Sequence, residues 1–171
     1  MDEYGRPVIK YLGSKRTLLP HILSAVKSHT DVHSVLDAFS GTSRVGKCLR
    51  ENGYRVQSND YSRYATTLAT AYVASTGKDF FDAAEVLPEL QALKGRAGWF
   101  TDTYCVKSRF FQPFNGERID AIREHIDSLN VSLNAKAILL TSLMEAADRV
   151  DSTVGLQMAY LKQWATRSFN A

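Results

Sequence analysis

Hydrophobic positions follow two patterns in the first half of the chain. Short apolar runs at 33–39 and 54–60 are bounded by turn-forming residues and predict strands. In 14–29, 42–53 and 61–75, apolar residues recur at every third or fourth position, which predicts amphipathic helices. This alternation of helices and strands indicates a parallel sheet with helices covering its faces.

The second half of the chain has helical periodicity and no further strong strand signal. Helices are predicted over 79–93, 117–129, 134–150 and 155–169. The stretch between Gly98 and Gly116 is rich in aromatic residues and is predicted to be irregular. We therefore expect an α/β portion at 1–78, with an incomplete parallel sheet, followed by a helical, aromatic-rich insertion at 79–171.

Length, charge and cysteine content set outer limits on the class of protein. With 171 residues, the chain is long enough for one domain with a substantial core. The net charge of +3 permits an anionic partner without requiring one. The two cysteines exclude a disulfide framework and a four-cysteine metal site. No apolar run approaches the length of a membrane span, and the N-terminus lacks the apolar core of a signal peptide, so we expect a cytoplasmic protein with no membrane partner.

The turn after the first predicted strand has two chemical interpretations. From Gly41 the letters GTSRVGKC match the phosphate-loop pattern GxxxxGK[ST] except at the last position. Cys48 stands where a hydroxyl would bind Mg²⁺, and a thiol is a poor ligand for that ion. Asp37 would also bring a carboxylate close to the phosphates, and residues 45–48 fit inside the predicted helix. A phosphate-loop NTPase is therefore disfavoured.

The same turn suits a different nucleoside cofactor. Asp37, at the end of the first strand, can accept a hydrogen bond from an ammonium group, and Gly41 lets the backbone approach a ligand closely. Asp60 ends the second strand, where a carboxylate is expected to bind the hydroxyls of an adenosine ribose. The cofactor with an ammonium group, a ribose and no phosphate is S-adenosylmethionine. Capping of the following helix is the simpler interpretation of Asp37 alone, but the three residues together favour the cofactor.

Three motifs within roughly the first 75 residues are distinctive together. They are YLGSKRTLLPHI, DAFSGT and SNDYS, in that order. In order and spacing they resemble the N-terminal segment and the two cofactor motifs of the Dam-type (class-alpha) adenine-specific DNA methyltransferases. WFTDTYCVKSRFFQPFNGERIDAI and LLTSLMEAADRV are also similar to segments of that family, though less distinctive. The resemblance implies a Rossmann-like S-adenosylmethionine-dependent methyltransferase fold.

The resemblance also implies roles for individual residues. It implies six cofactor-binding residues: Tyr11, Lys15, Asp37, Phe39, Gly41 and Asp60. Tyr11 and Lys15 would lie beside the methionine part of the cofactor, with Lys15 near its carboxylate. Asp60 would bind the ribose, and the other three residues would line the turn beneath the cofactor.

The sequence lacks the motif that carries catalysis in that family. These enzymes use a D-P-P-Y type motif, in which a polar side chain and a backbone carbonyl accept hydrogen bonds from the adenine amine and an aromatic ring stacks on the flipped base. The prolines here are Pro7, Pro20, Pro88 and Pro113, and none is adjacent to another. We therefore predict no catalytic residue in this chain, expect the catalytic strand to be absent from it, and expect it to be inactive alone.

The aromatic-rich stretch is also the predicted contact with DNA. Lys107 and Arg109 stand among aromatic residues there, a composition typical of sites that contact phosphates and distorted bases. Aromatic residues in irregular segments also commonly cover a core, so that alternative stays open. We predict DNA contacts by Lys107 and Arg109.

The expected function is S-adenosylmethionine-dependent methyl transfer to the exocyclic amine of adenine in double-stranded DNA. The remaining catalytic segment would come from another chain or from a longer polypeptide. One alternative is a methyltransferase for RNA or a small molecule, because cofactor motifs do not determine the acceptor. Another is a non-catalytic DNA-binding or regulatory module.

Overall fold

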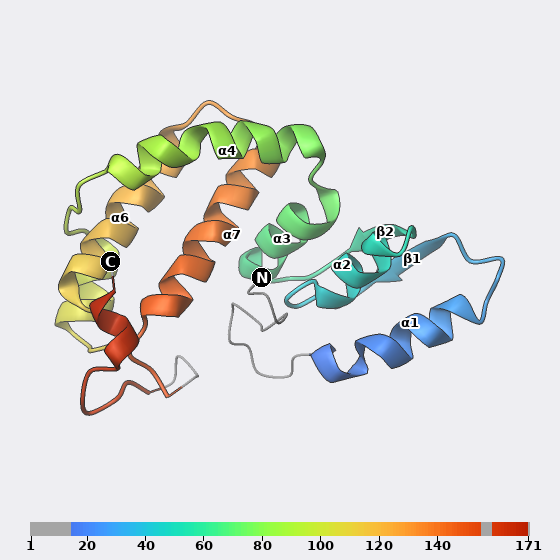
Figure 1. Ribbon diagram of the computed structural model, residues 1–171, viewed down its shortest axis with the longest axis horizontal. Helices are drawn as coiled ribbons and strands as arrows, with labels where there is room; N and C mark the ends of the chain where they lie inside the picture. The colour runs from blue at the N-terminus through green and yellow to red at the C-terminus, as the bar shows by residue number, and fades with distance from the viewer. Residues whose placement is uncertain (1–14, 155–158, 171) are drawn as a thin grey trace. The chain divides into compact units, whose positions relative to one another are not determined.

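The protein is a mixed α/β structure in which helices predominate (Figure 1). The computed structural model describes residues 15–154 and 159–170, so the predicted cofactor residue Tyr11 lies outside the described residues. The strands are β1 (Ser34–Asp37) and β2 (Arg55–Ser58). The helices are α1 (Leu19–Lys27), α2 (Arg44–Glu51), α3 (Arg63–Ala69), α4 (Gly77–Ala92), α5 (Trp99–Thr101), α6 (Pro113–Ser128) and α7 (Leu133–Val150). Short 3₁₀-helices cover Lys15–Leu18 and Thr166–Phe169, and π-helical turns cover Thr70–Ala74 and Asp102–Val106.

The two strands form a parallel sheet, which confirms the prediction from the apolar runs. Asp37 of β1 is paired with Ser58 of β2, so both strands end at the same edge. Helix α2 approaches one face closely because Gly46 has no side chain: a Cβ there would lie 3.0 Å from Ser58 Oγ. Neighbouring residues of a strand point to opposite faces, so Leu36 lies on the other face, where it is 61% exposed. One face of the sheet is therefore open at this position.

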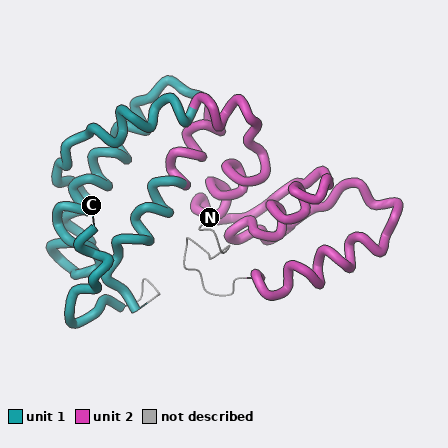
Figure 2. Tube along the Cα trace, in the orientation of Figure 1, with its two compact units in different colours: residues 1–12, 83–131, 142–171 teal, residues 13–82, 132–141 magenta. Residues whose placement is uncertain are grey.

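The described residues form two compact units, coloured magenta and teal in Figure 2. The strand unit contains residues 15–82 and 132–141, and the helical unit contains 83–131, 142–154 and 159–170. The buried apolar side chains of the strand unit are Leu49, Ala65, Leu68, Ala69, Ala71, Ala135, Ala137, Ile138 and Leu139. Those of the helical unit are Ala83, Leu90, Cys105, Phe111 and Ile126. The functional division at residues 78 and 79 stays a prediction. Among the described helices, none has the length and apolar content needed to cross a membrane.

Asp79 joins the start of α4 to the start of α7 inside the strand unit. Its carboxylate accepts hydrogen bonds from the backbone N–H of Thr76 at 2.8 Å and from the Thr76 hydroxyl at 2.7 Å. It also accepts from the Ser132 hydroxyl at 2.8 Å and from Asn134 Nδ2 at 3.3 Å. These bonds, above all those from Thr76, hold the pKa of Asp79 well below its usual range. Residues 132–141 thereby connect to a segment more than fifty positions earlier.

The prediction of an irregular segment over 98–116 is wrong in part. Helix α5 continues directly into the π-helical turn after it, and α6 already begins at Pro113. Asp120 of α6 explains the first of these differences. Its carboxylate accepts hydrogen bonds from the backbone N–H of Gly98 at 2.9 Å and of Thr101 at 2.8 Å, and from the Thr101 hydroxyl at 2.6 Å. A carboxylate at this place satisfies the free N–H groups that begin a helix.

The helix predicted over 155–169 is wrong for most of its described length. Residues 155–158 lie outside the described residues, and 159–165 are not helical. Only Thr166–Phe169 forms a helical turn, and it is of the 3₁₀ type.

Backbone groups of 159–165 bond elsewhere, which explains the absence of a helix there. Thr153 and Tyr160 form an antiparallel bridge. The N–H of Leu161 donates to the Ser152 carbonyl at 2.9 Å, and the N–H of Ala165 donates to the Ser152 hydroxyl at 3.0 Å. Because these N–H groups are engaged with Ser152, they are not available for i to i−4 helical bonds.

Candidate cofactor-binding site

The turns that follow β1 and β2 are joined by backbone hydrogen bonds. The N–H of Asn59 donates to the Asp37 carbonyl at 2.9 Å, and the N–H of Ser40 donates to the Asn59 carbonyl at 3.0 Å. Asn59 Nδ2 also donates to the Ala38 carbonyl at 3.0 Å. The residues predicted to contact a cofactor at the two strand ends are thus brought together, as parallel strands require.

Gly41 and Asp60 are in direct contact across these turns. The N–H of Gly41 donates to Asp60 Oδ2 at 2.9 Å, and the N–H of Ser62 donates to Asp60 Oδ1 at 3.0 Å. These two bonds, from Ser62 first and then from Gly41, hold the pKa of Asp60 below its usual value. Gly41 has φ +51°, and a Cβ there would meet no heavy atom of the described residues within 4 Å. The backbone at Gly41 is therefore open to a ligand, next to an ionised carboxylate.

Asp37 has an unsatisfied acceptor at the base of the site. Its side chain is 8% exposed, and within the described part of the chain its Oδ2 has no hydrogen-bond partner. The hydroxyls of Ser40 and Ser43 are buried in the same turn and likewise find no partner among the described residues. Buried polar atoms in folded proteins are nearly always hydrogen-bonded, and a buried carboxylate without a donor is costly. A ligand that brings a cationic donor, such as an ammonium group, fits this place.

Lys15 and two exposed aromatic rings complete the surroundings. Lys15 Nζ donates to the Phe39 carbonyl at 3.4 Å, a long bond, and its charge contributes to lowering the pKa of Asp60. The Phe39 ring is 82% exposed, and Tyr61, directly after Asp60, is fully exposed. Sequence reasoning missed Tyr61, although an aromatic residue next to the acid that ends a strand was a visible signal. Exposed rings beside a polar site offer stacking surfaces for a planar heterocycle.

Lys47 does not occupy the position of a phosphate-loop lysine. It lies within α2, with Nζ 3.9 Å from Glu51 Oε1 and 4.9 Å from the centre of the Tyr72 ring. Its ammonium group is therefore directed along α2 toward Glu51, away from the turn at Gly41. This geometry agrees with the chemical argument against an NTPase.

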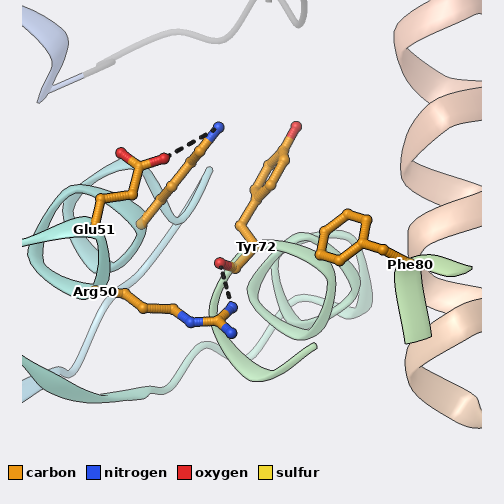
Figure 3. A pocket seen from close by; sticks show the side chains of 5 residues that line it. Arg50, Glu51, Tyr72 and Phe80 are labelled. Carbon is orange, nitrogen blue, oxygen red and sulfur yellow. Dashed lines mark hydrogen bonds and ion pairs between the residues drawn. The ribbon is translucent and has the colours of Figure 1, made fainter. Parts of the chain in front are cut away.

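A shallow pocket lies next to Lys47 in the strand unit (Figure 3). It has a volume of about 390 Å³ and is lined by Lys47, Arg50, Glu51, Tyr72 and Phe80. Arg50 donates to the backbone carbonyls of Tyr72 at 3.1 Å and of Ser75 at 2.5 Å, where the π-helical turn ends. None of the predicted cofactor residues that the structure describes lines this pocket.

The predicted DNA contacts lie in the helical unit and differ in their surroundings. The Lys107 side chain is 70% exposed and forms an ion pair with Asp102. Arg109 donates to the Lys162 carbonyl at 3.1 Å, and its guanidinium carbon lies 4.7 Å from the centre of the Trp164 ring. Lys107 therefore has the more accessible charge, whereas Arg109 is held by its neighbours.

The aromatic side chains of this unit pack mainly on one another. Phe100 and Phe111 have ring centres 5.1 Å apart, and Phe110 and Tyr160 have ring centres 5.4 Å apart. Phe111 is 4% exposed, whereas Trp99 is 70% exposed. Phe111 thus belongs to the core of the helical unit, the rings packed around it are half-buried or exposed, and Trp99 presents a ring to solvent.

Taken together, the chemistry of the strand ends suits a nucleoside-type ligand better than a polyphosphate. Two carboxylates, one buried and one ionised and half-buried, stand beside an open glycine and a lysine. Comparisons with known proteins identify the family. The family model of the D12 class N6 adenine-specific DNA methyltransferases matches residues 11–170. Because this covers nearly the whole chain, the chain belongs to that family. The resemblance to adenine-specific DNA methyltransferases stated from the three sequence motifs is confirmed, and the Dam-type subclass stays a prediction.

Individual relatives are type II methyltransferases and modification methylases by name. The chain is 31% identical over 166 residues to the type II methyltransferase M.NlaIII of Neisseria lactamica, which covers 90% of this chain and 49% of that protein. It is 29% identical over 179 residues to the modification methylase StsI of Streptococcus sanguinis, which covers 95% of this chain and 27% of that protein. It is also 29% identical over 163 residues to the type II methyltransferase M.CviAII of Paramecium bursaria Chlorella virus 1, covering 91% of this chain and 50% of that protein. The chain thus spans half or less of the length of these curated relatives. No solved structure matches the chain significantly.

Proposed function

We propose that this chain is the cofactor-binding portion of an enzyme that transfers a methyl group from S-adenosylmethionine to the N6 amine of adenine in double-stranded DNA. The observation that carries the proposal is the pair of carboxylates at the ends of adjacent strands, in a chain of this family. Asp37 has a buried oxygen that finds no partner in 15–154 or 159–170, and Asp60 is ionised next to Gly41. S-adenosylmethionine offers the matching donors, an ammonium group and two ribose hydroxyls.

Three of the predicted cofactor residues have a specific bonding role in this proposal. The residues assigned to the cofactor are Tyr11, Lys15, Asp37, Phe39, Gly41 and Asp60. Asp37 accepts from the ammonium group, Asp60 accepts from the ribose hydroxyls, and Lys15 pairs with the cofactor carboxylate. When bound, the cofactor supplies an electrophilic methyl group. The residues of this chain orient it and exclude water from it.

The open sheet supports a larger, Rossmann-like arrangement. A parallel sheet is normally covered on both faces, and two strands alone are marginal, yet Leu36 on β1 is largely exposed. We propose that a segment with a D-P-P-Y type motif, in the same polypeptide or on another chain, adds further strands and the catalytic residues. The chain contains no two adjacent prolines, so we expect no methyl transfer without such a segment.

The insertion at 79–171 is proposed to take part in DNA recognition. Lys107 has an exposed ammonium group, and Trp99 in the same unit has an exposed ring. Arg109 is proposed to reach a phosphate from its stacked position on Trp164. Action on cellular DNA fits the cytoplasmic location expected from the sequence.

Calorimetric titration with S-adenosylmethionine tests the cofactor site. We expect saturable binding by the chain and an affinity loss of about tenfold or more in Asp37→Asn, because a charged hydrogen bond to the ammonium group is lost. Asp31→Asn is the matched control: Asp31 is an exposed aspartate of the strand unit before β1, and its replacement should leave the affinity unchanged. Binding of Mg-ATP instead, or equal affinity in Asp37→Asn, would contradict the proposal.

A fusion tests the reaction. The chain is joined to the part of M.NlaIII that lies outside the matched region, and transfer of a labelled methyl group to duplex DNA is measured. We expect label on the N6 atom of adenine, and none when the fusion carries Asp37→Asn. Label on RNA in preference to duplex DNA would favour the alternative substrate class.

A further inference from the structure

Asp60 is bonded on both carboxylate oxygens to backbone groups of this chain. Oδ1 accepts a hydrogen bond from the N–H of Ser62, two positions later, and this bond closes a local turn. Oδ2 accepts from the N–H of Gly41, nineteen positions earlier, at 2.9 Å. The second bond connects the turn after β2 to the turn after β1. A residue assigned to the cofactor thus also contacts the backbone on which the cofactor is proposed to lie.

We propose that Asp60 is a positioning residue: its carboxylate holds turn 38–43 in the left-handed conformation at Gly41 that receives the cofactor. The consequence for the cofactor rests on the proposed function. The bond itself can be tested without any ligand.

The backbone conformation of turn 38–43 needs a stabilising contact from another part of the chain. Gly41 has φ +51°, and Ser43, two residues later, has φ +55°. Left-handed conformations are disfavoured for residues other than glycine. The Ser43 hydroxyl has no hydrogen-bond partner among the described residues, so the side chain of Ser43 does not stabilise its own conformation. The bond from Gly41 to Asp60 therefore stabilises the turn from outside it.

The Asp60 carboxylate can hold the turn and bind a ribose at the same time. The two carboxylate oxygens together accept about four hydrogen bonds. The backbone N–H groups of Gly41, Ser62 and Tyr61 engage at most three of these positions, which leaves one for a ribose hydroxyl. The hydrogen bonds that Asp60 accepts lower its pKa, which keeps it ionised and accepting at neutral pH.

The turn has two other long-range bonds at 3.0 Å, from the N–H of Ser40 to the Asn59 carbonyl and from Asn59 Nδ2 to the Ala38 carbonyl. Both act at residues 38 and 40, whereas the bond to Asp60 acts at Gly41 itself.

Amide exchange and chemical shift in the full chain, without cofactor, test the bond. In Asp60→Ala we expect the Gly41 amide to exchange about tenfold faster or more, because an amide that loses its acceptor is opened to water. Asp31→Ala, which changes an exposed aspartate of the same unit, should leave the Gly41 amide unchanged. In the unmodified chain, the Gly41 proton resonance should titrate with the Asp60 carboxyl, at a midpoint below the ordinary value for aspartate.

Two glycine variants test the consequence for the cofactor. Gly41 and Gly53 both have positive φ, +51° and +88°, and a Cβ at either would meet no heavy atom within 4 Å in the part of the chain that the structure describes. Alanine at either place therefore carries a conformational penalty without a steric clash. We expect Gly41→Ala and Gly53→Ala to lower the thermal midpoint to a similar extent. Only Gly41→Ala should weaken S-adenosylmethionine binding, by about tenfold.

The outcomes separate this inference from the proposed function. Unchanged exchange and shift of the Gly41 amide in Asp60→Ala would overturn the positioning role. Equal loss of cofactor affinity in the two glycine variants would also overturn it. If the Gly41 amide responds as expected while the chain binds no S-adenosylmethionine, the positioning role stands and the proposed function fails. Should Asp60→Ala not fold, the titration of the Gly41 resonance in the unmodified chain decides the question.

Discussion

Three aspartate side chains connect segments that are far apart in the sequence of this protein. In the strand unit, Asp60 accepts hydrogen bonds from backbone N–H groups, and Asp79 accepts them from backbone and side-chain donors. In the helical unit, Asp120 also accepts from both kinds of donor. Asp120 is 8% exposed. Burial alone would raise its pKa, but the bonds from Thr101 and its neighbours outweigh burial and hold the pKa below its usual value. A carboxylate in this setting is worth more to stability than one on the surface, because several buried donors depend on it.

Replacing Asp120 should therefore be costly. In Asp120→Ala the N–H groups of Gly98, Phe100 and Thr101 lose their acceptor, and we expect the free energy of unfolding to fall by roughly 3 kcal/mol. The measurement is urea denaturation followed by circular dichroism. The control is Asp127→Ala on the same helix, which removes an exposed ion pair with Arg123 and should change stability by about 0.5 kcal/mol or less. Equal effects of the two variants would contradict the role given to Asp120.

At the scale of elements, the helical unit depends on close approach between α6 and the π-helical turn Asp102–Val106. Gly116 of α6 faces Cys105 of that turn, and a Cβ on Gly116 would lie well inside contact distance of Cys105 Sγ. Cys105 is buried, and burial raises the pKa of its thiol to about 11. The thiol is thus a neutral packing group rather than a reactive one.

Enlarging Gly116 should push these two elements apart. We expect Gly116→Ala to destabilise the protein by roughly 2 kcal/mol through overpacking, despite the better helix propensity of alanine. Cys105→Ala in the same chain should recover part of the loss, because it removes the sulfur that the new Cβ meets. Gly77→Ala is the control, since a Cβ in the first turn of α4 meets no heavy atom of residues 15–154 and 159–170 within 4 Å. Thermal unfolding of the three variants checks the order of stability.

At the scale of the whole molecule, the three aspartates make stability depend on pH. Asp60, Asp79 and Asp120 all have pKa values below the ordinary one in the folded protein. The unfolded chain therefore binds protons first as the pH falls, and the stabilisation present at neutral pH is lost on acidification. We expect the free energy of unfolding to be constant from about pH 7 to pH 5 and to fall steeply below about pH 4. Urea titrations at several pH values test this, with Asp79→Asn expected to show a shallower decline; stability unchanged down to about pH 2 would contradict it.

Because the chain has a net charge of +3, we expect its proposed affinity for DNA to depend on salt concentration as well as on individual residues. Each phosphate contact releases condensed counterions, so affinity falls with salt in proportion to the number of contacts. We expect Lys107→Ala to weaken duplex binding and to reduce the slope of log affinity against log salt by about one. Lys78→Ala, at an exposed lysine in an i, i+4 pair with Asp82 in the strand unit, should leave the slope unchanged. Fluorescence anisotropy at several salt concentrations measures both.

Local patterns anticipated those elements whose hydrogen bonds are local. The helices α1, α2, α4 and α7 and the parallel strands β1 and β2 follow from apolar spacing over a few residues. The segments that were wrong, 98–106 and 159–165, take their backbone partners from residues such as Asp120 and Ser152. The spacing of apolar residues over a short stretch gives no information about a hydrogen-bond partner that lies many positions away in the chain.

The same distinction applies to the candidate site. Residue types and their spacing were enough to select Asp37, Gly41 and Asp60, to reject a phosphate loop, and to indicate the adenine-specific DNA methyltransferase family, because motif chemistry is written in consecutive residues. Only the folded chain decided that Asp60 bonds to the Gly41 backbone, that Asp37 keeps a buried oxygen without a partner among the described residues, and that Tyr61 is exposed beside them. These facts depend on how two strand ends meet in space, and the pairing of β1 with β2 brings together turns that are about twenty residues apart in the sequence.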